Sequence, residues 1–404
     1  MLYLYLLLYL YPFSGPRPDR SEKEGRLMRT DDLQRDTLLM AVHQVADRLL
    51  HLGGANYDED RSLSREEAMR TGLVARDAGI EEWDWPQGVG LYGLNLMQKV
   101  LGNDSAMDFF ASWYRRNLDT GLPSANVNTT APYLTLIDQM DRLPAPATWR
   151  RLCLERAEWL MTGLPKTKDG GFQHVTTGIG DRNSVILNEG QLWADTLFMA
   201  VLFLQKAGAA FQRPEWREEA LHQVLVHIKY LYDKHTGLLY HGYSFPRNDN
   251  FGGIFWCRGN SWFTLGLTLF LEEGAELSDG VRSYLIDTFR THIEALGRLQ
   301  APSGLFHTVL NDPDSYEEVS GAAAMAAGIY RGVRAGLLDA SQRQIADRAI
   351  RGIVENISED GTVMKVSAGT AMGMNREHYK NIAVRPMAYG QALALIALCE
   401  ALQA

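Results

Sequence analysis

The sequence predicts an all-α protein folded as an (α/α)6 barrel, with six inner and six outer helices. Two observations indicate this fold class. Six stretches of the 404-residue chain are apolar almost all round, which places them in the interior. Amphipathic, charged stretches alternate with them and keep one face for solvent. Two concentric layers of helices follow from this alternation, and an open α-solenoid is the competing architecture.

The inner helices are expected at the apolar stretches 87–102, 131–140, 187–205, 258–272, 320–338 and 385–403. The outer layer is exemplified by 214–235 and 279–299, where apolar residues recur every three or four positions. Short glycine-containing turns recur between the helices, at intervals that suit a pair of helices plus loops. Residues 238–244 and 361–367 are predicted as short strands.

Composition narrows the classes of partner. A net charge of −9 argues against a general nucleic-acid binder, which needs a basic surface to neutralise phosphates. The three cysteines, Cys153, Cys257 and Cys399, have neither metal-ligand spacing nor a disulfide framework. We therefore expect no metal and no other cofactor, and either a reducing compartment or simply unpaired thiols. The sequence does not predict an oligomeric state.

The N-terminus begins with "MLYLYLLLYLYPFSG", an apolar run without the basic residues of a secretory signal and too short to span a membrane. It is weak evidence for export, and no stable membrane insertion is expected. The competing interpretation, which we favour, starts the protein at Met28. Residues 1–27 are then a disordered or non-native extension, and 28–404 form a single catalytic barrel domain.

Aromatic and polar residues gather where the inner helices are expected to begin. They are Trp85, Asn128, Trp193, Asp195, Trp256, Arg258 and Trp262. Aromatic rings stack on sugar faces, and amide or guanidinium groups bind hydroxyls and carboxylates, so the set predicts a carbohydrate site. The alternative is that the tryptophans only fill the core.

Two residues of this set are four positions apart and so share one helical face. Arg258 and Trp262 would thus present a guanidinium beside a ring, which suits a sugar carboxylate. The alternative is a buried ion pair between Arg258 and Glu318. His174, His241 and His307 follow the recurring turns, and their equivalent positions favour a role in the site for His174 and His241.

Asp195 stands alone inside an apolar run, near Trp193 and Phe198. Desolvation there predicts a raised pKa, which suits a general acid. The alternative is a carboxylate satisfied by a neighbouring donor. Conventional glycosidases need a second carboxylate, and the spacing pairs none with Asp195. The candidates are Glu189, Glu317, Glu318 and Asp84.

Nine motifs, in this order and spacing, resemble the unsaturated rhamnogalacturonyl hydrolases of glycoside hydrolase family 105, and more distantly the unsaturated glucuronyl hydrolases of family 88. The resemblance covers about residues 40 to 400. The motifs are "WDWPQGVGLYGL", "NVNTTAPYL", "GGFQH", "LWADTLFMA", "TGLLYHGY", "FWCRGNSW", "SGLFHTVLND", "YEEVSGAAAMAAGIYRGVRAG" and "AGTAMG".

This resemblance implies an (α/α)6 barrel that removes the 4,5-unsaturated uronic acid from lyase-generated pectin oligosaccharides. It implies that Asp195 protonates the C4=C5 double bond and then takes a proton from the water that adds at C5. It assigns the sugar site to Trp85, His174, Trp193, His241, Trp256, Arg258, Trp262 and Lys365. Asn128 departs from the pattern, because some relatives have an aspartate there. No metal is implied. The resemblance also implies a cytoplasmic enzyme that acts on imported fragments, which the apolar N-terminus only weakly disputes.

Two other classes of protein stay open at this stage. A sugar epimerase would use a histidine pair such as His241 and His307 as acid and base. A non-catalytic carbohydrate-binding barrel would need the aromatic residues and Arg258 but not Asp195. The identity of the second sugar and the effect of Asn128 on substrate preference are not predicted.

Overall fold

The computed structural model describes residues 35–53, 67, 74–273 and 277–404, which belong to one compact unit. The predicted N-terminal extension, residues 1–27, lies outside the described residues. None of the described helices is both long enough and apolar enough to cross a membrane.

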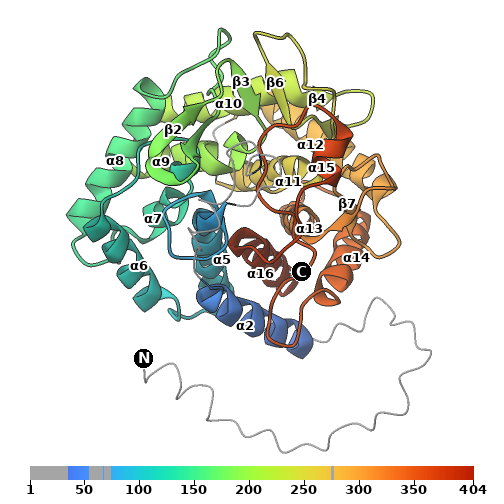
Figure 1. Ribbon diagram of the computed structural model, residues 1–404, viewed down its shortest axis with the longest axis horizontal. Helices are drawn as coiled ribbons and strands as arrows, with labels where there is room; N and C mark the ends of the chain where they lie inside the picture. The colour runs from blue at the N-terminus through green and yellow to red at the C-terminus, as the bar shows by residue number, and fades with distance from the viewer. Residues whose placement is uncertain (1–34, 54–66, 68–73, 274–276) are drawn as a thin grey trace, which may run out of the picture. The chain divides into compact units, whose positions relative to one another are not determined.

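In the described part of the chain, six helical units form an inner ring and six helices surround them (Figure 1). The inner units are α5 (Trp85–Leu101), α7 (Tyr133–Gln139), α9 (Leu202–Ala210) with the π-helix η3 (Leu197–Val201) before it, α11 (Cys257–Glu272), α13 (Val319–Arg334) and α16 (Ala388–Ala401). The outer helices are α2 (Arg35–His51), α6 (Met107–Thr120), α8 (Pro146–Thr162), α10 (Pro214–Leu231), α12 (Asp279–Leu299) and α14 (Arg343–Val354). The predicted (α/α)6 barrel is confirmed.

Burial explains the two layers. Nearly every residue of α11 and α16 is buried, whereas α12 buries one stripe that includes Leu285, Phe289 and Ile293. Glycines let inner helices approach closely: a Cβ on Gly328 of α13 would lie 2.6 Å from the carbonyl oxygen of Thr264 on α11. The inner helices can therefore pack with their backbones in contact.

Short elements complete the described fold. The strands form two-stranded antiparallel sheets, which pair β1 (Val175–Gly178) with β2 (Asp181–Leu187), β3 (Gln191–Trp193) with β6 (Gly242–Ser244), β4 (Tyr232–Asp233) with β5 (Leu238–Leu239) and β7 (Phe306–His307) with β8 (Glu317–Glu318). The remaining short helices are η1 (Ala75–Asp77), η2 (Asn128–Thr130), η4 (Ala340–Gln342) and α15 (Arg376–Lys380).

The strand predictions were partly right. Residues 238–244 contain β5 and β6, but 361–367 contribute only isolated bridges, through Val363 and Ser367. The β1–β2 hairpin was not predicted.

The stretch 187–205 is not a helix throughout, which corrects the prediction for this inner element. Its first residue, Leu187, ends β2, and Gln191–Trp193 form β3, because their backbone pairs with Gly242–Ser244 of β6. A turn at Ala194 and Asp195 follows, and only then does the helix begin. An apolar run of this kind has no periodicity that separates a buried strand from a buried helix.

Candidate active site

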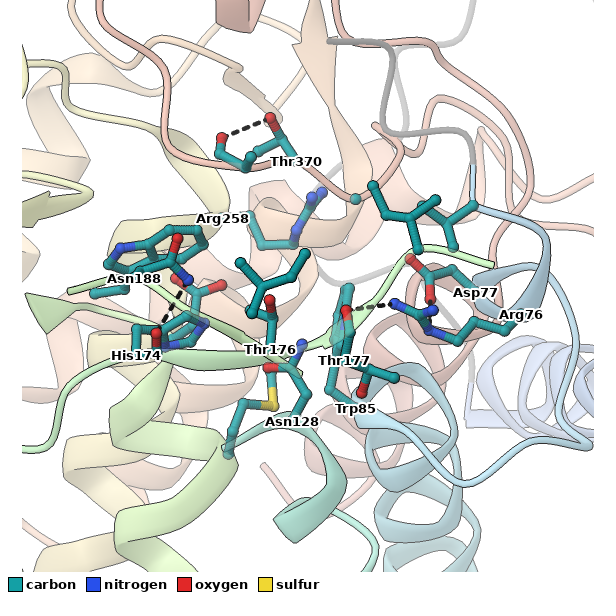
Figure 2. Close-up of a pocket in the computed structure, with 18 of the residues that line it drawn as sticks. Arg76, Asp77, Trp85, Asn128, His174, Thr176, Thr177, Asn188, Arg258 and Thr370 are labelled. Carbon is teal, nitrogen blue, oxygen red and sulfur yellow. Dashed lines mark hydrogen bonds and ion pairs between the residues drawn. The ribbon is translucent and has the colours of Figure 1, made fainter. Parts of the chain in front are cut away.

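An open pocket lies where the inner helices begin. The predicted residues that line it are Trp85, Asn128, His174, Trp193, Asp195, Trp256 and Arg258. They come from the start of α5, from η2, from the residue before β1, from the end of β3 and the turn after it, and from the start of α11. In Figure 2, His174 and Asn188 lie on one side of this pocket, and Arg76 and Asp77 on the other.

Asp195 is in contact with a buried histidine behind it. Nε2 of His241 lies 3.3 Å from Oδ2 of Asp195, and neither atom has another hydrogen-bond partner in the described chain. His241 is held in place by its neighbours, because its ring packs on Trp256 with the ring centres 4.3 Å apart. The backbone adds to this arrangement, since the N–H of Ala194 donates to the carbonyl of His241 at 2.9 Å.

The pKa of Asp195 is lowered, which makes the prediction of a raised pKa wrong. Burial acts to raise this pKa, as the apolar sequence suggested. The contact with His241 and the positive charge of Arg258 outweigh the burial, and the net shift is downward. The sequence showed the apolar neighbours of Asp195 but not the histidine brought to it from β6.

Aromatic rings form the walls around Asp195. Trp193 stacks on His174 with ring centres 4.2 Å apart and an angle of 11° between the planes. Burial lowers the pKa of His174 to about 3, so the ring is neutral at physiological pH. Trp85 is half-buried and packs on Tyr389 at 4.4 Å. Flat, neutral surfaces of this kind suit the faces of a sugar ring.

Arg258 combines both roles that the sequence left open. Its Nη1 lies 3.8 Å from Oε1 of Glu318, and both side chains are buried, so the ion pair exists. The guanidinium also lies over the ring of Trp256, with Cζ 4.4 Å from the ring centre, and donates from Nη2 to the carbonyl of Ala368 at 2.8 Å. It still lines the pocket, where it supplies a rigidly held positive charge.

Three predicted sugar-site residues do not line the pocket. His241 lies behind Asp195. Trp262 is one helical turn further along α11 than Arg258, which puts it beneath the pocket, where its ring meets Phe198 at 5.2 Å. Lys365 is half-exposed and lies 4.0 Å from Glu317 at the surface.

The structure adds pocket residues that sequence reasoning missed. They are Val74, Arg76, Asp77, Thr176, Thr177, Ile179, Ile186, Asn188, Met199, Gly369, Thr370 and Ala371. Arg76 joins two of these segments, because its Nη1 donates to the carbonyl of Gly178 on the hairpin and its Nε lies 3.1 Å from Asp84. An Arg-Asp pair directly before "GIEEWDW" was the signal available in the sequence, but nothing in its spacing connected it to Asp195.

Of the carboxylates proposed as partners for Asp195, none lines the pocket. Asp84 caps α5 and Glu318 caps α13. Glu317 lies near Lys365, and Glu189 is exposed. Among the described residues, the carboxylates that line the pocket are Asp195 and Asp77. His307, the second histidine of the epimerase alternative, is bound through Nδ1 to the carbonyl of Ser315 and also lies outside the lining.

Comparisons with known proteins agree with this geometry. The family model for Glycosyl Hydrolase Family 88 matches residues 65–404. The unsaturated rhamnogalacturonyl hydrolase YesR of Bacillus subtilis is 32% identical over 322 residues, which cover 80% of this chain and 90% of that protein. A solved structure of a candidate family 105 member from Salmonella enterica is 35% identical, with a TM-score of 0.82 over 98% of this chain and 99% of the other. An unsaturated glucuronyl hydrolase from Bacillus sp. GL1 shares the fold at 17% identity, with a TM-score of 0.62 over 90% and 96% of the two chains.

The fold and these matches define a glycoside hydrolase built on an (α/α)6 barrel. The chain belongs to the family that the Glycosyl Hydrolase Family 88 model describes. Within it, the chain is similar to the unsaturated rhamnogalacturonyl hydrolase YesR and to the candidate family 105 structure.

Proposed function

We propose that this enzyme removes a 4,5-unsaturated uronic acid from the non-reducing end of lyase-generated oligosaccharides of the rhamnogalacturonan type, and that Asp195 carries both proton transfers. The observation on which the proposal depends is the position of Asp195. It lines an aromatic pocket, it is backed by His241 at 3.3 Å, and a rigidly held Arg258 lies in the same pocket. The names of the relatives supply the class of substrate.

The charge of the pocket suits a uronate. Arg258 provides a cation, and the inner helices begin at this end, so the positive ends of their dipoles favour an anion there. The carboxylate of the unsaturated ring would bind on that side, and the flat faces of Trp85 and Trp193 would hold the ring.

The first step needs a protonated Asp195. A bound uronate adds a second negative charge and excludes water, and both effects raise the pKa of Asp195 from its lowered value. The carboxylic acid then gives its proton to C4 of the double bond. The positive charge that develops at C5 is shared with the ring oxygen.

The second step returns the proton. Water adds to C5, and the Asp195 carboxylate accepts the proton that the water loses. The product is a hemiketal at C5. When it opens, C5 becomes a ketone and C1 a hemiacetal, which releases the remaining saccharide as its free alcohol. No glycosyl-enzyme forms, so the reaction needs no second carboxylate beside Asp195.

The other two functions receive less support. An epimerase would need His307 near His241 in the pocket, but His307 is engaged by Ser315 outside the lining. A non-catalytic sugar-binding barrel would give no role to the Asp195–His241 contact, which holds a partly buried carboxylate at the wall of the pocket.

The test follows the ultraviolet absorbance of an unsaturated uronic acid disaccharide linked to rhamnose. Hydration destroys the conjugated double bond, so the protein should abolish the absorbance while it releases rhamnose. The control is the saturated disaccharide with the same linkage, which should remain intact. Cleavage of both disaccharides with the absorbance preserved would identify an ordinary glycosidase instead. No change in any unsaturated uronide would refute the proposal.

A further inference from the structure

A tyrosine from the far end of the chain reaches the back of the site. Tyr379 lies on α15, it is fully buried, and its Oη lies 2.7 Å from Nδ1 of His241, 138 positions away in the sequence. The ring of Tyr379 meets the His241 ring edge-on at 5.7 Å. Tyr379 does not line the pocket, so any effect on the reaction would pass through His241.

The neighbours of Tyr379 determine the direction of this hydrogen bond. The backbone N–H of Gly373 donates to Oη at 3.2 Å, so the phenol oxygen already accepts one bond. Burial raises the pKa of Tyr379, and the hydroxyl keeps its proton. That proton has two available acceptors, Nδ1 of His241 at 2.7 Å and the thioether of Met372 at 3.7 Å. The imidazole nitrogen is the nearer and the stronger acceptor.

The second ring nitrogen of His241, Nε2, indicates the same direction for the hydrogen bond from Tyr379. A neutral ring that accepts at Nδ1 carries its proton on Nε2. Nε2 lies 3.3 Å from Oδ2 of Asp195, so this tautomer places an N–H next to a carboxylate oxygen, and neither atom has another partner in the described chain. In the opposite tautomer, a nitrogen lone pair would face a carboxylate oxygen in a buried site, which is unfavourable.

We propose that Tyr379 is a positioning residue: its hydroxyl keeps His241 in the tautomer with the proton on Nε2, and His241 thereby directs the exchangeable proton of Asp195 to Oδ1. Because Oδ2 accepts from His241, Oδ1 is the oxygen left for the substrate. The inference rests on the proposed role of Asp195 as the proton carrier.

The same chain of hydrogen bonds connects Asp195 to the pocket rim. Gly373 lies two residues after the segment in which Gly369, Thr370 and Ala371 line the pocket. His378, next to Tyr379, holds this segment through Thr370 at 2.7 Å. The loop that lines the pocket therefore also supplies the N–H of Gly373, which is the first donor in the series of hydrogen bonds that leads to Asp195.

The first measurement is ¹⁵N NMR of the ring nitrogens in the full-length protein, with the His241 signals identified by their loss in His241→Asn. In the wild type we expect a protonated Nε2 and an unprotonated Nδ1. In Tyr379→Phe, which keeps the ring but loses the donor, we expect the proton to move at least partly to Nδ1. A wild-type ring protonated on Nδ1 would overturn the proposal, and this result does not depend on how well the variant folds.

The second measurement separates positioning from packing. Tyr379→Phe should lower kcat by about 10-fold to 100-fold, the usual effect of removing a group that orients a functional side chain, and leave KM within about twofold. The matched control is Tyr330→Phe, which removes a buried hydroxyl bound to Asp347, outside the pocket lining, and should leave kcat and the His241 signals unchanged.

A Tyr379→Phe variant with wild-type kcat and the proton still on Nε2 would refute the positioning role. If the wild type has the predicted tautomer but does not act on any unsaturated uronide, the proposed function fails while the assignment of the hydrogen bonds stands. The two ideas can therefore be judged separately.

Discussion

At the pocket end of the barrel, the side chains of Asp195, Trp256 and Arg258 line the pocket, and Nε1 of Trp256 and Nε of Arg258 lack hydrogen-bond partners in the described chain. At the opposite end, buried charges are paired. Glu400 binds the guanidinium groups of Arg331 and Arg334.

The two ends are well separated. Arg258 and Glu272 lie near opposite ends of α11, fourteen residues apart, which corresponds to about 21 Å at a rise of about 1.5 Å per residue. Buried atoms without a hydrogen-bond partner occur at both ends of the described barrel, since Nε of Arg331 also has none. The pocket end differs because its polar side chains line the pocket, which indicates selection for binding and chemistry. Satisfied charges at the other end hold the inner helices together. The two ends should therefore respond differently to the same kind of substitution.

The largest expected effect is on catalysis at the pocket end. Asp195→Asn keeps the shape of the side chain but removes the transferable proton, and should lower kcat by about 10²-fold to 10⁴-fold. The melting temperature should change little, since the amide removes a buried charge without leaving a cavity. Asp169→Asn, at a carboxylate bound to Lys229 outside the pocket, is the control and should keep full activity. Near-normal turnover in Asp195→Asn would remove this residue from the mechanism.

The equivalent change at the opposite end should affect stability. Glu400→Gln leaves Arg331 and Arg334 without their shared carboxylate and should lower the free energy of unfolding by about 2 to 3 kcal/mol. This loss of unfolding free energy is smaller than the loss on breaking a fully buried ion pair, because the two guanidinium groups are partly exposed to solvent. Urea denaturation measures the loss, and kcat should be unchanged at temperatures where the variant is folded. A large loss of kcat in a stable variant would show that the two ends are coupled.

A smaller effect is expected on substrate binding. Trp85→Ala removes a half-buried ring from the pocket wall and should raise KM by about tenfold, with a much smaller change in kcat, since the ring contacts the sugar throughout the reaction. Steady-state kinetics on the unsaturated disaccharide measure both constants. An unchanged KM would show that the sugar does not stack on Trp85.

The smallest expected effect is the change per pH unit. As pH rises, activity should fall, whereas stability should increase. The lowered pKa of Asp195 means that its protonated form becomes scarcer as pH rises, so kcat/KM should fall by at most about tenfold per pH unit. At the other end, burial of Asp138 is outweighed by Lys206 and Lys99, and its pKa is also lowered. Stability from Asp138 is therefore complete above its unfolded pKa of about 3.9 and is lost as pH falls through the folded value.

The two pH profiles are measured as kcat/KM and as the urea midpoint across the acidic and neutral range. A kcat/KM that increases with pH would contradict the role of Asp195 as an acid in the first step.

The inner helices could be predicted because a long stretch that is apolar all round must be buried on every side. Stretches such as 258–272 and 385–403 are apolar all round, and they form inner helices α11 and α16. The pocket residues at helix starts could be predicted for a related reason. Inner helices that run in the same direction bring their first residues together, as Trp85 and Arg258 show.

The rest depends on contacts between distant parts of the chain. Tyr379 contacts His241, which is 138 positions away in the sequence, and no local pattern predicts that contact. The direction of the Asp195 pKa shift was missed for the same reason, since His241 arrives on β6. Lys365 was placed in the site by resemblance of motifs, and Trp262 also by its spacing from Arg258. Lys365 is half-exposed near Glu317, and Trp262 lies a helical turn below the pocket. A motif fixes the order of residues along the chain, not the direction of each side chain.

The central claim is that the enzyme hydrates a double bond and that Asp195 supplies the proton. The most direct measurement is the reaction of the unsaturated disaccharide in D₂O, with early product examined by NMR before the ketone can exchange its neighbouring hydrogens. The account predicts one deuterium at C4, on a single face, in the product of the wild type, and no such product from Asp195→Asn. A released uronic acid that retains its C4=C5 double bond and carries no deuterium at C4 would contradict it.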